Sequence, residues 1–363
     1  MEKALQYLDP HQYFSSETKL RIFHHPDLKA QALEVKKVFS HLNLKDHYGI
    51  FSSGTSSGSP KGYVHSIDAL KANAQAVNEF FSLKSEDIWA LSLPDYHIGG
   101  LQVLLRAQLS GAKVVDARGW EPVKWNETLR KGGVSVTSIV PTQLYDLVKL
   151  SLKPSPSLRY LIVGGDFLSL ELEKRAIELG WPLIRTFGMT EAASQIASST
   201  LHESALQILP IHELKTSAEE TLLIRSPALF SYSFQKEKDW EIRPVSLDAE
   251  GFYKTQDKVL LEGETVIPQG RSGDEFKSKG HLIRLSDLRE TLQKYLIEHS
   301  LFSKAEIYFA EDERKGKKIV LLHENLETHT IHSLKERLAP VVIDELKSVN
   351  KIDRTALGKS IRL

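Results

Sequence analysis

Residues 160 to 191 read YLIVGGDFLSLELEKRAIELGWPLIRTFGMTE, and this stretch holds the pattern from which the fold class follows. The short apolar run at 160–163 is typical of a buried strand, and two glycines separate it from a helical stretch at 170–179. Gly180 and the proline two residues further on mark the end of that helix, and a second apolar run follows at 183–186. The succession predicts two parallel strands joined by a crossover helix.

The same alternation reaches back along the chain, with further predicted strands at 88–93, 113–116 and 134–140 and helices at 99–109 and 141–150. Strands and helices in alternation indicate an α/β fold, in which a mainly parallel sheet is covered by helices on both faces.

The sequence pattern changes after residue 201. Short β-strands without intervening helices are expected at 221–224, 252–253, 259–261 and 265–267. A compact α+β unit follows residue 270, and the stretch Arg-Ser-Gly-Asp at 271–274 is predicted to be a hinge. We therefore expect a large domain over 1–270, which includes the β-rich segment, and a small C-terminal domain over 271–363.

Composition excludes several classes of function. The chain has 363 residues, with 47 basic and 47 acidic side chains, so no overall field favours nucleic acid or an anionic membrane. It has no cysteine, which removes disulfides, zinc-thiolate sites and a cysteine nucleophile. No signal peptide and no apolar run of about 20 residues is recognisable, so a cytoplasmic protein is expected.

A loop rich in hydroxyls and glycines occupies residues 52–62, SSGTSSGSPKG. Its glycines permit a tight backbone, its hydroxyl and N–H groups can donate to oxygens, and Lys61 adds a positive charge, so it is suited to phosphate. The alternative is a flexible Ser/Gly linker, but Pro60 and Lys61 disfavour it. The candidate phosphate-binding residues are Ser53, Gly54, Thr55, Ser56, Ser57, Gly58 and Lys61.

Four further clusters are expected at the carboxyl ends of strands, where open α/β sheets bind ligands. They are His97 in LPDYHIGGL, the turn Gly164-Gly165-Asp166, the pentapeptide Phe187-Gly188-Met189-Thr190-Glu191, and Asp257 in Thr-Gln-Asp, taken to lie beyond a strand. A hydroxyl beside a carboxylate, as in Thr190 and Glu191, suits a phosphate oxygen and Mg²⁺. Taken singly, a histidine such as His97 is more often a structural residue that caps a helix than a binding residue.

In this order the clusters resemble the motifs of the adenylate-forming (ANL) superfamily of acyl-CoA synthetases. The resemblance covers about 310 residues and extends to Gly270 and Arg271, and to Lys359 near the C-terminus. Within the superfamily, SLPDYHIGGL and TFGMTEAASQI are most similar to the o-succinylbenzoate:CoA ligases of menaquinone biosynthesis.

The resemblance implies two half-reactions. A carboxylate attacks the α-phosphorus of ATP to give an acyl-adenylate and pyrophosphate, and the thiol of CoA then displaces AMP. ATP, Mg²⁺ and CoA are the implied small molecules, with no nucleic-acid or membrane partner and with homo-oligomerisation left open. The small C-terminal domain is implied to be mobile, with its hinge at Gly273 and Asp274.

The resemblance also assigns roles residue by residue. It implies catalytic roles for Lys359, Thr190, Glu191 and His97, with Glu191 holding the metal. It implies nucleotide binding by the loop residues Ser53 to Lys61 named above and by Gly164, Gly165, Asp166, Phe187, Gly188, Met189, Thr190, Asp257 and Arg271. For the acid it implies His97, Arg106, Gly165 and Ser194, with Arg106 pairing with the second carboxylate of o-succinylbenzoate; a helix arginine that reaches solvent is the alternative.

Some positions depart from the family pattern. Only 51 residues precede the loop at 52–62, so a shortened N-terminal region is expected. The loop holds one residue more than usual, Gln256 replaces the glycine of the Thr-Gly-Asp motif, and 201–250 matches poorly. Two other functions therefore stay open: a ligase for another aromatic or short acid, and a non-catalytic nucleotide- or acyl-binding relative.

Overall fold

The computed structural model describes residues 5–14, 19–42, 44–52, 60–278, 281–312 and 316–354. Its α-helices are α1 (Lys29–Phe39), α2 (Ile67–Phe80), α3 (Ile98–Ser110), α4 (Pro122–Lys131), α5 (Pro141–Lys149), α6 (Leu170–Glu178), α7 (Leu285–Glu298) and α8 (Thr328–Leu338). Short 3₁₀ turns are η1 (Pro10–Gln12), η2 (Pro26–Leu28), η3 (Ser40–Leu42) and η4 (Thr190–Ala192).

The strands of the large body are β1 (Tyr7–Leu8), β2 (Arg21–Phe23), β3 (His47–Phe51), β4 (Lys61–Ser66), β5 (Ile88–Leu91), β6 (Lys113–Asp116), β7 (Val136–Ile139), β8 (Tyr160–Val163), β9 (Leu183–Met189), β10 (Ser194–Ser198), β11 (Leu206–Ile208), β12 (Glu213–Thr216), β13 (Thr221–Arg225), β14 (Tyr232–Lys236), β15 (Trp240–Pro244), β16 (Tyr253–Glu262) and β17 (Thr265–Arg271). The C-terminal part contains β18 (Glu275–Ser278), β19 (His281–Arg284), β20 (Ala305–Asp312), β21 (Gly316–Glu324) and β22 (Glu345–Val349).

One long sheet crosses the large body in the order β1-β6-β5-β7-β8-β9-β10-β11-β17-β16-β13-β12. Strands β6, β5, β7, β8 and β9 pair in parallel, and the pairs from β9 to β12 are antiparallel. The mainly parallel α/β fold predicted from the sequence is confirmed for this half of the sheet, and β9 is the strand at which the direction changes.

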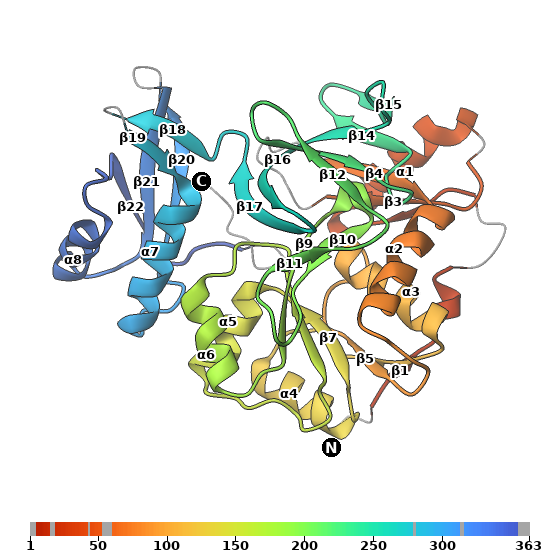
Figure 1. Cartoon of the computed structure of the whole chain (residues 1–363), viewed down its shortest axis with the longest axis horizontal. Helices are drawn as coiled ribbons and strands as arrows, with labels where there is room; N and C mark the ends of the chain where they lie inside the picture. The colour runs from red at the N-terminus through yellow and green to blue at the C-terminus, as the bar shows by residue number, and fades with distance from the viewer. Residues whose placement is uncertain are drawn as a thin grey trace.

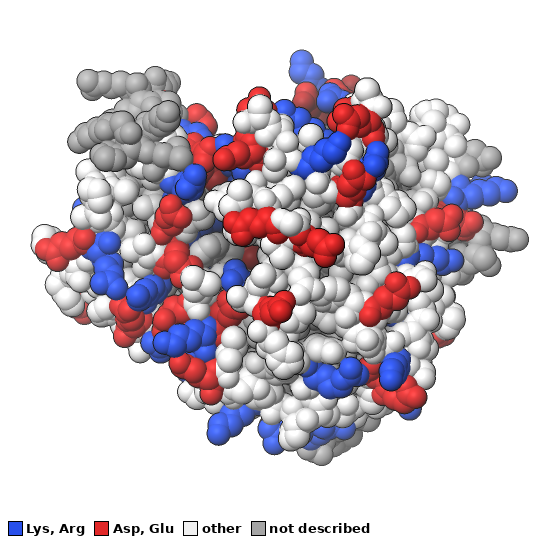
Figure 2. Space-filling model, viewed as in Figure 1, with Lys and Arg blue, Asp and Glu red and all other residues white. Residues whose placement is uncertain are grey.

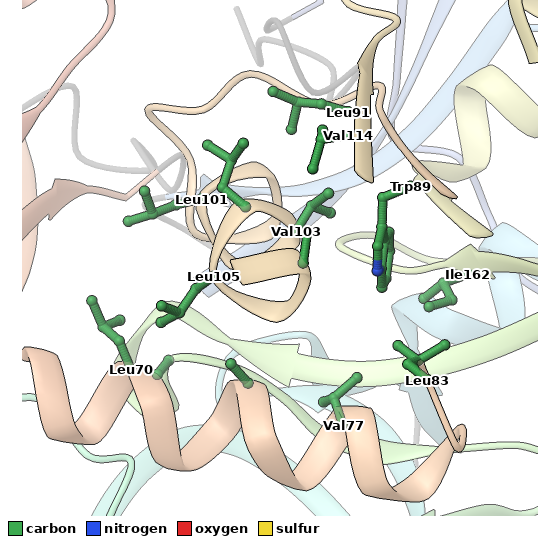
Figure 3. Packing of buried hydrophobic residues seen from close by; sticks show 14 of the residues in the cluster. Leu70, Val77, Leu83, Trp89, Leu91, Leu101, Val103, Leu105, Val114 and Ile162 are labelled. Atoms are coloured by element: carbon green, nitrogen blue, oxygen red, sulfur yellow. The ribbon is translucent and has the colours of Figure 1, made fainter. Parts of the chain in front are cut away.

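Helices cover both faces of the parallel strands, and side chains alternate between the two cores. Trp89 and Leu91 of β5 pack with α2 and α3, as Figure 3 shows for Trp89. Ala90, between them, packs with α4, α5 and α6 in the second core. Successive side chains of a strand point to opposite faces of the sheet. Because both faces are covered by apolar layers, neighbouring residues of β5 belong to different cores.

A second sheet has the order β15-β14-β4-β3-β2, and α1 packs in the apolar cluster that covers it. The C-terminal unit consists of α7 and α8 packed on β20-β21-β22, beside the hairpin of β18 and β19 (Figure 1). The boundary at 270 and 271 falls at the end of β17 and stays a prediction.

Most predicted strand bounds differ from the observed ones by two residues or fewer, but some differ by more. The predicted pieces at 252–253 and 259–261 form one strand, β16, with a register shift between Lys258 and Val259. Strand β9 continues beyond the predicted end at 186 to Met189, because it pairs there with β10. Polar residues interrupted the apolar pattern in both places, whereas pairing with a neighbouring strand kept the backbone extended.

The surface agrees with the balanced composition: Figure 2 shows acidic and basic side chains interspersed on the face in view, and the formal net charge is zero. Among the described helices, none is long and apolar enough to cross a membrane.

Candidate active site

The predicted clusters lie where the parallel strands end. His97 follows β5, Gly164 and Gly165 follow β8, and Phe187 to Glu191 span the end of β9 and the turn η4. Since β5, β7, β8 and β9 run in parallel, their carboxyl ends share one edge of the sheet. The structure thus brings together three clusters that are far apart in the sequence.

Glu191 is held at both its side chain and its backbone. The hydroxyl of Tyr63 donates a hydrogen bond of 2.7 Å to Glu191 Oε1, and the N–H of Phe230 donates to the Glu191 carbonyl at 3.0 Å. The side-chain amide of Asn73, on α2, donates to the carbonyls of Ala192 and Gln195 at 3.2 and 2.7 Å. These bonds fix the turn that carries Thr190 and Glu191.

Asp257 and Arg271 form an ion pair across the hairpin of β16 and β17. They are register partners, and Arg271 Nε lies 2.9 Å from Asp257 Oδ1. Burial opposes the charge of Arg271, but Asp257, with smaller contributions from Glu191 and Asp274, raises its pKa above the ordinary value. Arg271 is therefore within electrostatic reach of both Asp257 and Glu191. Asp257 lies inside β16 and not beyond a strand, so that part of the prediction was wrong.

Arg106 is the most unusual charged residue near this edge. Its side chain faces the interior from α3, and the residue is only 2% exposed. Its NH2 group lies 3.4 Å from Ser194 Oγ, while its Nε has no hydrogen-bond partner among the described residues, which also offer it no carboxylate. Burial lowers the pKa of Arg106 to about 9, which reflects how costly an unpaired cation is in this place.

Ser194 reaches Arg106 because the backbone before it turns sharply. Ala193 and Ser194 have φ values of +57° and +120°, in the region that side chains other than glycine rarely adopt. Gly188 makes this turn possible, since a Cβ there would lie 2.0 Å from the Ser194 carbonyl oxygen. Glu191 and Ser194 thus belong to one short, constrained segment that runs from the end of β9 to the first residue of β10.

His97 is the residue just before α3, and its side chain makes no capping hydrogen bond to that helix. Its ring lies 4.7 Å from the ring of Tyr96, and the neighbouring Asp95 accepts a bond of 2.8 Å from Arg118. His97 therefore occupies the N-cap position of α3 without capping it through the side chain, and the residue is half-buried.

Gly164, Gly165 and Asp166 form the turn after β8, as the sequence predicts. A Cβ on Gly164 would lie 2.2 Å from Thr186 Oγ1, so the strands β8 and β9 approach closely there. Asp166 is exposed and accepts a bond from the N–H of Phe167.

The predicted phosphate loop is framed by described residues at both ends. The N–H of Ser52 donates to the Lys61 carbonyl at 2.9 Å, so the ends of the loop are adjacent. Several predicted site residues lie outside the described residues, namely Ser53, Gly54, Thr55, Ser56, Ser57, Gly58 and Lys359.

Two surface hollows lie away from this edge. One of about 770 Å³ is lined by Pro210, Pro227 and Leu247 among others, and it shares only Phe230 with the surroundings of Glu191. The other, of about 510 Å³, lies between β1 and the end of α3. The convergence of charged groups, and not cavity volume, therefore marks the candidate site.

The sequence model of the AMP-binding enzyme family matches residues 21–216, which carry the predicted phosphate loop, His97, Arg106 and Glu191. This chain belongs to the AMP-binding enzyme family.

Individual relatives agree with this membership. The 2-succinylbenzoate–CoA ligase of Bacillus cytotoxicus is 25% identical over 345 residues, covering 86% of this chain and 68% of the relative. That of Listeria monocytogenes (strain F2365) is 28% identical over 256 residues, 68% of this chain and 53% of the relative. The matches thus span about half to two thirds of the length of these relatives.

Solved structures show the same fold. The o-succinylbenzoate CoA synthetase of Bacillus subtilis, in complex with the acyl-adenylate intermediate, superposes with a TM-score of 0.72 at 22% identity, covering 86% of this chain and 67% of that one. An anthranilate CoA ligase with bound anthranoyl-AMP gives a TM-score of 0.71 at 19% identity, covering 86% and 65%.

Sequence reasoning missed several residues of this AMP-binding enzyme's candidate site, and above all Tyr63, Asn73, Phe230 and Tyr253. Burial raises the pKa of Tyr253 to about 12, with Glu191 and Asp257 adding to the shift. One available signal was the position of Tyr63, two residues after Lys61 and so on the same face of the chain wherever the backbone is extended. No comparable signal marks Phe230 or Asn73.

The Glu191 carboxylate is suited to a cation that is bound together with a nucleotide. Among the described residues, no group of three or more His, Asp or Glu side chains could hold a metal ion. Mg²⁺ is commonly bound by one or two carboxylates together with substrate phosphates, and Glu191 provides such a carboxylate. The residues present therefore fit a magnesium–nucleotide complex.

Proposed function

We propose that this enzyme is an ATP-dependent acid:CoA ligase that acts through an acyl-adenylate, with o-succinylbenzoate as the acid. The observation that carries the proposal is the buried Arg106, which has no carboxylate partner among the described residues. Arg106 lies on α3 and contacts Ser194, three residues after Glu191. A buried cation to which the protein offers no carboxylate is expected where a ligand supplies the anion. The names of the relatives support this acid.

On the nucleotide side, the pair Asp257 and Arg271 would fix the ribose, and Phe187 would stack on adenine. Lys61 and the loop before it would hold the terminal phosphates, while Thr190 would contact the α-phosphate. Glu191 would hold Mg²⁺, which when bound neutralises charge on the phosphate oxygens.

On the acid side, Arg106 and the Ser194 hydroxyl would bind the carboxylate that does not react, and His97 and Gly165 would line the path to the reactive one. Arg106 and Ser194 at one end of the acid, and His97 and Gly165 near the other, would orient the reacting carboxylate toward the α-phosphorus. Lys359 would bring a positive charge to the point where carboxylate and phosphate meet. Because ATP and CoA are phosphorylated, charged molecules, we propose the cytoplasm as the compartment.

The test is pyrophosphate release from the full chain with ATP, Mg²⁺ and a panel of acids that includes o-succinylbenzoate, benzoate and anthranilate. We expect release with o-succinylbenzoate, followed by CoA ester formation, and a loss of at least about 100-fold in Lys359→Ala. Lys351→Ala, which removes an exposed lysine of the same region, serves as the matched control.

The outcomes separate three functions. Release with anthranilate or benzoate but not with o-succinylbenzoate would replace the acid and keep the ligase. No release with any acid, together with retained ATP binding, would indicate a non-catalytic nucleotide-binding relative.

A further inference from the structure

Strand β4 presents two different faces, and one of them is directed at the turn that carries Glu191. Gly62 and Val64 face the apolar cluster of the second sheet, where a Cβ on Gly62 would lie 2.3 Å from Phe234. Tyr63 alternates with them and bonds to Glu191, and His65 lies beside the backbone of Thr190. The strand that follows the phosphate loop therefore also supports the end of β9.

The Tyr63 phenol is buried and fixed. The residue is 9% exposed, and its ring lies 4.9 Å from the ring of Phe230, which in turn lies 5.0 Å from that of Tyr253. Phe230 also donates its N–H to the Glu191 carbonyl. Tyr63 and Phe230 thus hold Glu191 from two sides, one at the carboxylate and one at the backbone.

The hydrogen bond uses one oxygen of the carboxylate and leaves the other available. Tyr63 donates to Oε1, whereas no described residue donates to Oε2. A short bond from a neutral donor to a carboxylate is among the stronger hydrogen bonds in proteins, and it restricts the rotation of the glutamate side chain. The same oxygen is therefore presented each time a cation approaches.

We propose that Tyr63 is a positioning residue: it orients Glu191 so that Oε2 is free to bind the cation of a magnesium–nucleotide complex. The inference rests on the proposed function for the identity of that ligand. Without the hydroxyl, Glu191 would have to be ordered when the metal binds, and the affinity for the metal would fall.

The test measures binding and needs no turnover. Mn²⁺, used in place of Mg²⁺, is titrated into the full chain with ATP but without any acid, and free Mn²⁺ is followed by electron paramagnetic resonance. Tyr63→Phe keeps the ring and its contact with Phe230, and it should weaken Mn²⁺ binding about tenfold. Binding of ATP without metal should change by less than about twofold. Tyr232→Phe, on the neighbouring strand β14, is the control and should behave as the wild type.

A double-mutant cycle with Glu191→Gln completes the test. If Tyr63 acts through Glu191, the double variant binds Mn²⁺ no more weakly than Glu191→Gln alone. Unchanged or tighter Mn²⁺ binding in a folded Tyr63→Phe would overturn the inference, because the hydroxyl would then be irrelevant or would compete with the metal. An independent loss in the double variant would overturn it as well.

The inference and the proposed function can fail separately. Weaker Mn²⁺ binding in Tyr63→Phe, with no pyrophosphate from any acid in the wild type, would keep the positioning role and remove the ligase. Pyrophosphate release by a Tyr63→Phe variant with normal Mn²⁺ binding would keep the ligase and remove the positioning role of Tyr63.

Discussion

Arg106 shows how the environment of one side chain gives it a function. On an exposed helix an arginine reaches solvent along its apolar stem. Here the guanidinium is buried between α3 and the start of β10, with the Ser194 hydroxyl as its near neighbour. The sequence placed Arg106 on a helix behind His97 but left open whether it was exposed. Its burial turns a common surface residue into a candidate anion site.

Replacement of Arg106 should separate binding from stability. Arg106→Met keeps much of the volume and removes the charge, so we expect the KM for the acid to rise about 10- to 100-fold while the KM for ATP changes less than about twofold. Because no protein carboxylate loses its partner, the free energy of unfolding should not fall. Steady-state kinetics and urea unfolding test both statements.

Arg130→Met, on an exposed part of α4, is the matched control for Arg106. Equal effects on the two KM values, or a large loss of stability without a change in KM, would show that Arg106 is a structural residue.

At the scale of elements, the turn between β9 and β10 depends on packing from other strands and helices. The sequence predicted the strand, the glycine and the Thr-Glu pair, because these follow from local pattern. It did not predict that β4, α2 and the segment before β14 would hold the turn through Tyr63, Asn73 and Phe230. Those contacts join elements that are remote in the chain.

Two buried histidines link these elements and should make their packing sensitive to pH. His65, on β4, is fully buried, and its ring nitrogens lack a hydrogen bond of ordinary geometry among the described residues. His212 Nε2 lies 3.1 Å from the Gln195 carbonyl of β10. Burial lowers the pKa of each histidine to about 4, so both are neutral at pH 7.

Stability should therefore fall in mildly acidic solution. The unfolded chain takes up these protons near pH 6.5, whereas the folded chain resists until about pH 4. The contribution of each neutral histidine to the free energy of unfolding is thus fully present above pH 6.5. As the pH falls toward 4 this contribution is lost, which lowers the free energy of unfolding by about 3 kcal/mol for each histidine.

Urea unfolding at a series of pH values measures this effect. His65→Gln should reduce the slope of the unfolding free energy between pH 6.5 and 4, and His202→Gln, at an exposed position, should leave it unchanged. An identical slope in His65→Gln and the wild type would contradict the assignment.

At the scale of the whole molecule, the C-terminal unit is joined to the large body by α7 as well as by the chain. Glu290, on α7, accepts hydrogen bonds from the N–H of Leu170 at 3.1 and 3.2 Å, at the start of α6. A carboxylate there satisfies an unpaired N–H and interacts favourably with the helix dipole. Burial raises the pKa of Glu290, and the hydrogen bond from the Leu170 N–H and then the charge of Arg185 partly oppose this effect.

Removing this carboxylate should loosen the contact between the two parts. Glu290→Gln keeps the size and loses the charge, and we expect amide exchange in the first turn of α6 and in α7 to become about fivefold faster, the equivalent of about 1 kcal/mol. Hydrogen exchange with mass spectrometry gives the rates.

Glu298→Gln is the control, because its weak contact with Arg337 is partly exposed. If Glu290→Gln leaves the exchange of both segments unchanged, the capping contact does not contribute to the docking of the C-terminal unit.

The sequence by itself determined what depends on neighbours along the chain: the α/β alternation from residue 88 to 186, the glycine turns, and the motif that ends in Thr190 and Glu191. Periodicity and turn chemistry are local properties, so they can be read before the fold is known. Tertiary structure alone decided the partners. Tyr63 and Glu191 are 128 residues apart, Arg106 and Ser194 are 88 apart, and Leu170 and Glu290 are 120 apart. The burial and the hydrogen-bond partners of these side chains depend on the whole packed chain. Desolvation and these hydrogen bonds arise only when segments that are distant in the sequence come into contact.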